Sequence, residues 1–324
     1  MIKTNPLFRL LLALLLAALM PWTAVHAQSY PSKPIRFIYP YPAGGSGDNI
    51  MRLVAEMLGP ELGGTVYVDN RPGASGVVGS RTVAESPPDG YTIGLTSNGT
   101  HAAVMSLVKN PGYDPLKNFT HLGLFASLPW MLVVPVQLPF QSVNDLVTWA
   151  RANPGKLTMS HYSSSSRVLV HMLQSAGKLQ LTEVPYKAPG QVINDLYGGQ
   201  LQAAFLPMEI AMAQAAGGKV RVLGSASEKR LPGAPQVPTI AEQLPGVAMT
   251  SWMGMGAPVG LPPDVSAKLQ AALTRVVNKP EFRERLQKIG GDVLINTPEQ
   301  IDVRIRDEMV LWAKFAKDAG VQPE

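Results

Sequence analysis

The spacing of apolar residues changes between positions 35 and 58, and the change predicts a strand, a loop and a helix. Ile35–Tyr39 is a short run of β-branched and aromatic residues, which favours a strand. Residues 40–47 contain two prolines and three glycines, so they predict a loop. From residue 50 to residue 58 apolar positions recur at intervals of three and four, which indicates an amphipathic helix. Either Ser46 or Gly47 is expected to cap this helix, with Asp48 in its first turn.

The amides of this loop should point at one spot above the carboxyl end of the strand, where open α/β sheets bind anions. The motif is not a dinucleotide fingerprint, because Ile50 stands where the third glycine belongs. Nor is it a phosphate-binding loop, because Asp48 replaces the expected cation. We interpret Asp48 as an acceptor for the loop's own amides. The loop therefore suits a small carboxylate, and the alternative is a structural turn without a ligand.

Strand-like and helix-like segments alternate along the rest of the chain, which predicts an α/β fold with parallel sheets and helices on both faces. The last helix should begin after Thr297 as its N-cap and pack Trp312 and Phe315 inward. Further strands are expected at residues 65–68, 91–95, 128–135, 157–160, 182–185, 201–205, 220–224 and 249–257.

Loops rich in glycine, serine or threonine follow three of the expected strands. Residues 40–47, 69–76 and 96–101 should lie on one edge of a doubly wound sheet, because the carboxyl ends of parallel strands meet there. Ser97 and Thr100 offer hydroxyl donors, whereas His101 is interpreted as a cap residue. Residues 163–166, four consecutive serines before a helix, form a further donor-rich loop or else a flexible polar loop.

The first 27 residues read as a secretory signal peptide. A basic start precedes an apolar run that is too short to span a membrane, and residues 25–27 suit a cleavage site. The mature chain should begin near Gln28 and lie in a periplasm as a soluble monomer. Without the two basic residues of the signal it carries 26 basic and 23 acidic residues, and these are scattered. Nucleic acid is therefore not expected as a partner. The absence of cysteine indicates that the core stabilises the fold without disulfides.

Signatures of enzymes are weak in this chain. G-x-S-x-G and H-E-x-x-H are both absent, so neither a nucleophile elbow nor a zinc site is supported, and no cofactor is expected. We expect no catalysis. The alternative is an exported hydrolase whose serine lies within residues 163–166 and whose base is His161 or His171.

Several longer motifs carry a resemblance to one family. They are Tyr30-Pro31-Ser32-Lys33-Pro34-Ile35 with the loop at 40–48, Asn70-Arg71-Pro72-Gly73-Ala74, Pro87-Pro88-Asp89-Gly90-Tyr91-Thr92, Val184-Pro185-Tyr186-Lys187 and Pro235-Gln236-Val237-Pro238-Thr239. In this order they resemble the extracytoplasmic solute-binding proteins of tripartite tricarboxylate transporters, the Bug family. The resemblance covers essentially the whole mature chain.

The resemblance implies a type II periplasmic binding protein, in which two Rossmann-like α/β domains close on a ligand in the cleft between them. Domain 1 would comprise residues 28–127 and 248–324, and domain 2 residues 128–247. Such a protein captures a small carboxylate and delivers it to the membrane permease subunits of the transporter; a ligand-loaded sensor accessory is the alternative role. The implied ligand-binding residues are Tyr41, Ala43, Gly44, Gly45, Ser46, Asp48, Ser97, Asn98, Thr100, Ser163, Ser164, Ser165, Ser166 and Gln202.

The chain departs from the family pattern where members commonly carry acids after a G-G-Q turn. Gln202 and Leu206 occupy these positions, and Arg167 follows the serine run. Donors should then outnumber acceptors around the ligand. This reasoning predicts an amine-free ligand, either a di- or tricarboxylate or an aromatic acid resting on Tyr41 or Trp252.

Overall fold

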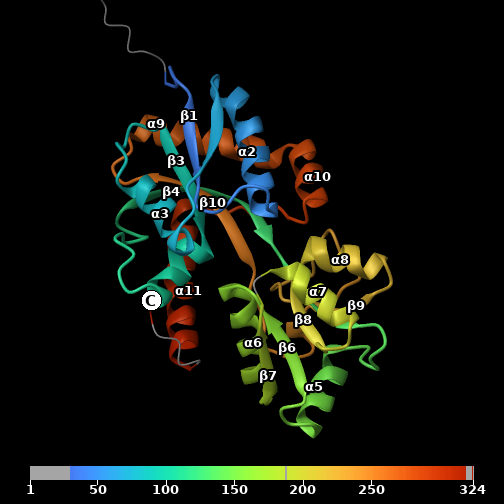
Figure 1. The fold of residues 1–324 in the computed structure, drawn as a ribbon. Helices are drawn as coiled ribbons and strands as arrows, with labels where there is room; N and C mark the ends of the chain where they lie inside the picture. The colour runs from blue at the N-terminus through green and yellow to red at the C-terminus, as the bar shows by residue number, and fades with distance from the viewer. Residues whose placement is uncertain (1–29, 187, 319–322, 324) are drawn as a thin grey trace, which may run out of the picture.

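The computed structural model describes residues 30–186, 188–318 and 323, and these residues form two α/β units (Figure 1). The predicted signal peptide and Lys187 lie outside the described residues. Each unit is built on a five-stranded sheet, with strand order β2-β1-β3-β10-β4 in the first and β7-β6-β8-β5-β9 in the second. The α/β class is thus confirmed.

Strands of the first sheet come from both ends of the chain. They are β1 (Ile35–Tyr39), β2 (Val66–Asn70), β3 (Thr92–Ser97), β4 (Phe119–Leu128) and β10 (Ser251–Pro258). The helical elements of this unit are α2 (Ser46–Leu62), η1 (Ala74–Gly76), α3 (Val77–Ala84), η2 (Gly99–Ala103), α4 (Val104–Leu107), α9 (Pro263–Asn278), α10 (Pro280–Lys288) and α11 (Pro298–Asp318).

The second sheet is contiguous in sequence. Its strands are β5 (Trp130–Pro135), β6 (Leu157–His161), β7 (Leu181–Pro185), β8 (Ala203–Pro207) and β9 (Val220–Ser225). The helices between them are α5 (Val143–Ala152), α6 (Ser164–Gly177), α7 (Pro189–Tyr197) and α8 (Met208–Ala216), and the short η3 (Ile240–Glu242) follows β9.

One strand in each sheet runs against the others, so the sheets are mixed, and the predicted parallel direction holds for the other four strands of each sheet. β10 pairs antiparallel with β3 and β4, and β5 pairs antiparallel with β8 and β9. Both strands begin where the chain has just crossed from the other unit. A strand that enters at the edge where β3 or β8 ends must run in the opposite direction to it. The first crossing is the single residue Pro129. The second lies at the end of residues 226–250, which connect β9 to β10 and pack mainly on the second unit.

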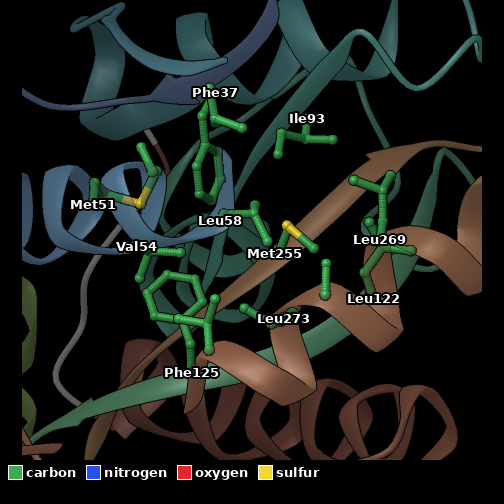
Figure 2. Packing of buried hydrophobic residues seen from close by; sticks show 14 of the residues in the cluster. Phe37, Met51, Val54, Leu58, Ile93, Leu122, Phe125, Met255, Leu269 and Leu273 are labelled. Carbon is green, nitrogen blue, oxygen red and sulfur yellow. The ribbon is translucent and has the colours of Figure 1, made fainter. Parts of the chain in front are cut away.

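The core of the first unit lies between its sheet and two helices (Figure 2). Met51, Val54 and Leu58 project from α2 and are fully buried. Val54 and Leu58 belong to the predicted apolar face, and Met51 adds to it. They pack in one cluster with Phe37, Ile93, Leu122, Phe125 and Met255 of the sheet and with Leu269 and Leu273 of α9. Burial of this face fixes the start of α2, and with it the loop after β1.

The C-terminal helix α11 begins as predicted. Thr297 Oγ1 accepts a hydrogen bond from Gln300 N (3.3 Å), and Gln300 Oε1 accepts one from Thr297 N (3.0 Å). Trp312 and Phe315 are buried as expected, in a cluster that belongs mainly to the second unit. Along the part of the chain that is described, no helix is both long and apolar enough to cross a membrane.

Candidate functional site

A cavity of about 580 Å³ lies between the two units. The first unit lines it with residues from the loop after β1 and from η1, η2 and α4. The second unit contributes residues at the start of β5, at the ends of β6 and β8, and at the starts of α6, α7 and α8. Trp312 of α11 completes the wall. Because loops and helix starts from both units converge here, we take this cavity as the candidate site.

Parallel pairing brings the first unit's three loops to one edge. β1 pairs in parallel with both β2 and β3, so their carboxyl ends lie side by side. The half-buried Tyr41 lies among the loops: a Cβ added to Gly76 would meet the side chains of Thr100 and Tyr41, and one added to Gly99 would meet Tyr41 Oη. Gly76 and Gly99 therefore permit a close approach that larger residues would block.

The segment after β3 is more ordered than predicted. Ser97 still belongs to the strand, and residues 99–103 form a π-helical turn in place of a polar loop. Ser97 Oγ lies 3.0 Å from Thr100 Oγ1, which lies 2.9 Å from His101 Nδ1. Ser97, Asn98 and Thr100 are buried beneath the cavity, and Gly99 lines it instead. Burial, together with neighbouring His121, lowers the pKa of His101 well below its usual value.

Asp48 is buried and binds several donors. Its carboxylate accepts hydrogen bonds from Gly44 N (3.0 Å), Asn70 Nδ2 (2.9 Å) and Arg52 Nε (2.9 Å). The first of these agrees with the prediction that Asp48 holds the loop's own amides. Burial alone would raise the pKa of Asp48, but the hydrogen bonds from Asn70, Gly44 and Arg52 hold it below its usual value. The Asp48 carboxylate therefore stabilises the conformation of the loop, and it is not among the residues that line the cavity.

The start of α2 differs from the prediction. Gly45 is the N-cap, and no side chain caps the helix, so the assignment of Ser46 or Gly47 as the cap is wrong. Ser46 is the first helical residue and lines the cavity with Gly45. Ala43 and Gly44 are exposed and lie outside the cavity lining.

The four serines at residues 163–166 in the second unit have two roles: some cap α6, and some line the cavity. Ser163 Oγ accepts a hydrogen bond from Ser166 N (3.2 Å), and Ser166 Oγ accepts one from Ser163 N (3.0 Å), which closes a capping box. Ser166 is fully buried, whereas Ser163 and Ser165 line the cavity. Ser164 begins α6.

Gln202 and Leu206 do not reach the cavity, so their use to infer the ligand is wrong. Gln202 precedes β8, and its Oε1 accepts hydrogen bonds from Thr158 N (2.6 Å) and Oγ1 (2.7 Å). The cavity lies at the other end of β8, at Pro207. Leu206 is fully buried in the core. Trp252 is also buried and donates to Glu308 (2.8 Å), so it offers no platform for an aromatic acid.

Several cavity residues were missed by the sequence reasoning. Among them are Trp130, Tyr162 and Glu209, all of which line the cavity from the second unit. Glu209 Oε1 accepts a 2.6 Å hydrogen bond from Ser46 Oγ across the cavity. Burial raises the pKa of Glu209, more than the bond from Ser46 lowers it. An acid four residues after the predicted strand at 201–205 was a signal that could have identified Glu209.

Among the described side chains of the serine run, no hydrogen bond joins a serine to His161 or His171. His161 Nε2 lies 3.8 Å from Glu183, and His171 Nε2 lies 4.0 Å from Asp318. Ser163 and Ser166 bond to one another, as described above. Within the described ranges, no group of His, Cys, Asp and Glu side chains could hold a metal ion.

Two α/β units joined by crossing segments, with a ligand-sized cavity between them, define a two-domain periplasmic binding protein of type II. The tripartite tricarboxylate transporter family receptor model, TctC, matches residues 50–321. The chain belongs to this family and is a solute-binding protein.

Relatives and solved structures agree with this assignment. The chain is 31% identical to BugT of Bordetella pertussis over 92% of this chain and 93% of that protein. The structure of periplasmic binding protein BugD matches with a TM-score of 0.74 and 33% identity, over 91% of this chain and 100% of that one. An R. palustris protein solved with adipate matches with a TM-score of 0.77 and 30% identity, over 91% of this chain and 100% of that one. MatC from Rhodopseudomonas palustris, solved with bound malate, matches with a TM-score of 0.72 and 28% identity, over 88% of this chain and 99% of that one.

Proposed function

We propose that the cavity between the two units holds one small carboxylate, with Tyr41, Gly45, Ser46, Ser163 and Ser165 as its contacts. One observation carries this proposal: the starts of α2 and α6 line the same cavity from opposite units. Helix N-termini present unpaired amides and a partial positive charge, which favour an anion. The adipate and malate bound by two relatives support the same ligand chemistry.

The function proposed is capture without catalysis, followed by delivery to a membrane permease of the tripartite type. Export by the N-terminal signal peptide would bring the chain to the periplasm, and no permanent partner is needed there. Closure is proposed to occur by rotation of domain 1 (residues 28–127 and 248–324) against domain 2 (128–247). The crossing at Pro129 and the crossing that ends at residue 250 support this division, because these two segments connect the strands of one sheet to those of the other.

The proposal can be tested by a thermal-shift screen of small carboxylates. A ligand at 100 times its dissociation constant stabilises the folded protein by about 2.7 kcal/mol, which raises the melting temperature by several degrees. Ser165→Ala should reduce the shift without changing the melting temperature of the free protein. Ser266→Ala on α9, outside the cavity, is the control. If no carboxylate raises the melting temperature and none is retained in native mass spectrometry, the proposal is wrong.

A further inference from the structure

The cavity carries an acid but no base among its described lining residues. Glu209, in the first turn of α8, is the single charged side chain of that lining. Its Oε1 accepts the hydrogen bond from Ser46, and its Oε2 is buried without a hydrogen-bond partner. A carboxylate in this position therefore has one hydroxyl donor and no compensating cation among the described lining residues.

Contacts from the first unit hold Glu209 in place. Ser46 approaches one carboxylate oxygen, and Gly290, just after α10, lies against the rest of the side chain. A Cβ added to Gly290 would overlap Glu209 Cβ and lie 2.7 Å from Oε2. The carboxylate thus occupies a defined position at the boundary of the two units and cannot turn away to solvent without loss of these contacts.

A second unpaired group lies on the same wall. The hydroxyl of Tyr162 is buried and makes no hydrogen bond within the described structure. Burial, together with the nearby charge of Glu209, raises the pKa of Tyr162, so this hydroxyl keeps its proton and is a donor. The wall of the cavity therefore contains a buried donor without a partner at Tyr162 and a buried acceptor without a partner at Glu209.

These two groups require different partners from the ligand. Tyr162 and the serines at the start of α6 suit a carboxylate. Glu209 opposes one, because like charges in a poorly solvated site repel and a buried charge without a partner is unfavourable. An ammonium group would satisfy Oε2 and neutralise the charge at once.

We propose that Glu209 determines the specificity of the cleft and selects carboxylates that also carry an ammonium group. This inference rests on the proposed function, since it specifies a second functional group of the same ligand. It replaces the prediction of an amine-free ligand, which relied on two positions that lie outside the cavity.

The test compares ligands that differ only in the substituent on one carbon atom. Succinate, malate and aspartate share a four-carbon diacid and carry hydrogen, hydroxyl or ammonium at carbon 2. Butanoate, 2-hydroxybutanoate and 2-aminobutanoate do the same with one carboxylate. Affinities are measured by calorimetry at pH 8 for the wild type, for Glu209→Gln and for the control Glu284→Gln, whose side chain is exposed on α10.

In the wild type and in Glu284→Gln, the ammonium member of at least one series should bind about tenfold or more tightly than the hydrogen member, as expected for a charge-assisted hydrogen bond. Glu209→Gln keeps an acceptor for Ser46 but loses the charge. It should reduce that ratio to about two or less while the amine-free acids bind as well or better. At a pH where Glu209 of the free wild type is partly protonated, binding of the ammonium ligand should also release protons, because a bound cation lowers the raised pKa of Glu209.

Two outcomes would overturn the inference, and they are distinguishable. If amine-free acids bind the wild type as tightly as their ammonium partners, and Glu209→Gln changes neither, Glu209 does not select the ligand although the cleft binds carboxylates. If no member of either series binds and the wider carboxylate screen is also negative, the proposed function fails and the inference fails with it. The melting temperature of each variant shows that it is folded.

Discussion

Replacing Glu308 by glutamine should remove a pH dependence from the stability of the fold. Glu308 lies on α11, and both of its carboxylate oxygens accept from Trp252 Nε1, at 2.8 and 2.9 Å. Arg304 lies 3.5 Å away on the same helix. Burial nevertheless dominates over both partners and raises the pKa of Glu308 from 4.5 to about 7. The site adjoins residues 248–250, where the chain returns to the first sheet.

The sign and size of the effect follow from proton binding. Because the native state keeps the Glu308 proton to a higher pH than the unfolded state does, the free energy of unfolding falls as pH rises from 4.5 to 7. A shift of this size corresponds to roughly 3 kcal/mol at most. The side chain is only 18% exposed, so solvent screens little of it. The stabilisation is complete below pH 4.5 and is lost above pH 7.

The assay is urea unfolding of the wild type and of Glu308→Gln between pH 4.5 and 8. Glutamine does not titrate, so the variant should gain about 3 kcal/mol relative to the wild type across this range, equivalent to ~5 °C in melting temperature. Other titrating groups are common to both proteins and cancel. The exposed control Glu284→Gln should show no such trend. A difference between wild type and Glu308→Gln that stays constant with pH would refute the reasoning.

Three further predictions concern the loop after β1, the boundary between the units and closure. Asp48→Ala should cost about 3 kcal/mol in urea unfolding, more than a simple helix cap, because Gly44 N, Asn70 Nδ2 and Arg52 Nε all lose their buried acceptor. Asp48→Asn should cost less, and a loss under about 1 kcal/mol for alanine would contradict this. The stability supplied by Asp48 should be lost as pH falls below 3.8, since its pKa is lowered. Gly290→Ala should weaken ligand binding whereas Gly63→Ala should not: both have positive φ, but only the former would overlap Glu209. X-ray scattering should show compaction when ligand is added, and identical curves with a confirmed ligand would exclude closure.

Local patterns predicted much of the fold. The β-branched run of β1, the apolar spacing of α2 and the cap at Thr297 each depend on neighbours in sequence, and each was found as predicted. Two elements were missed for physical reasons. In α10 only Phe282 and Leu286 are buried, so its apolar face is too narrow to recognise. In β4 the buried His121 interrupts the apolar pattern.

The sequence predicted the site only where its residues lie in loops that follow the ends of parallel strands. The loops after β1 and β3 could be placed beside the ligand cleft because they terminate parallel strands. Sequence periodicity does not indicate which residue of such a loop faces the cavity, so buried Thr100 was chosen in place of Gly99. Glu209 depends on a contact with Ser46 that joins residues 163 positions apart. A contact between residues so far apart in the sequence produces no periodic pattern from which it could be predicted.

The position of β10 inside the first sheet has a consequence for the order in which the protein can be completed. β10 pairs with β3 and β4, yet it is synthesised more than 120 residues after β4 ends. During that interval the facing edges of β3 and β4 have no partner and are open to pairing with other chains. All strands of the second sheet have by then emerged. The second unit can therefore fold before β10 completes the first sheet. This late, long-range pairing should limit the rate at which a functional cleft forms.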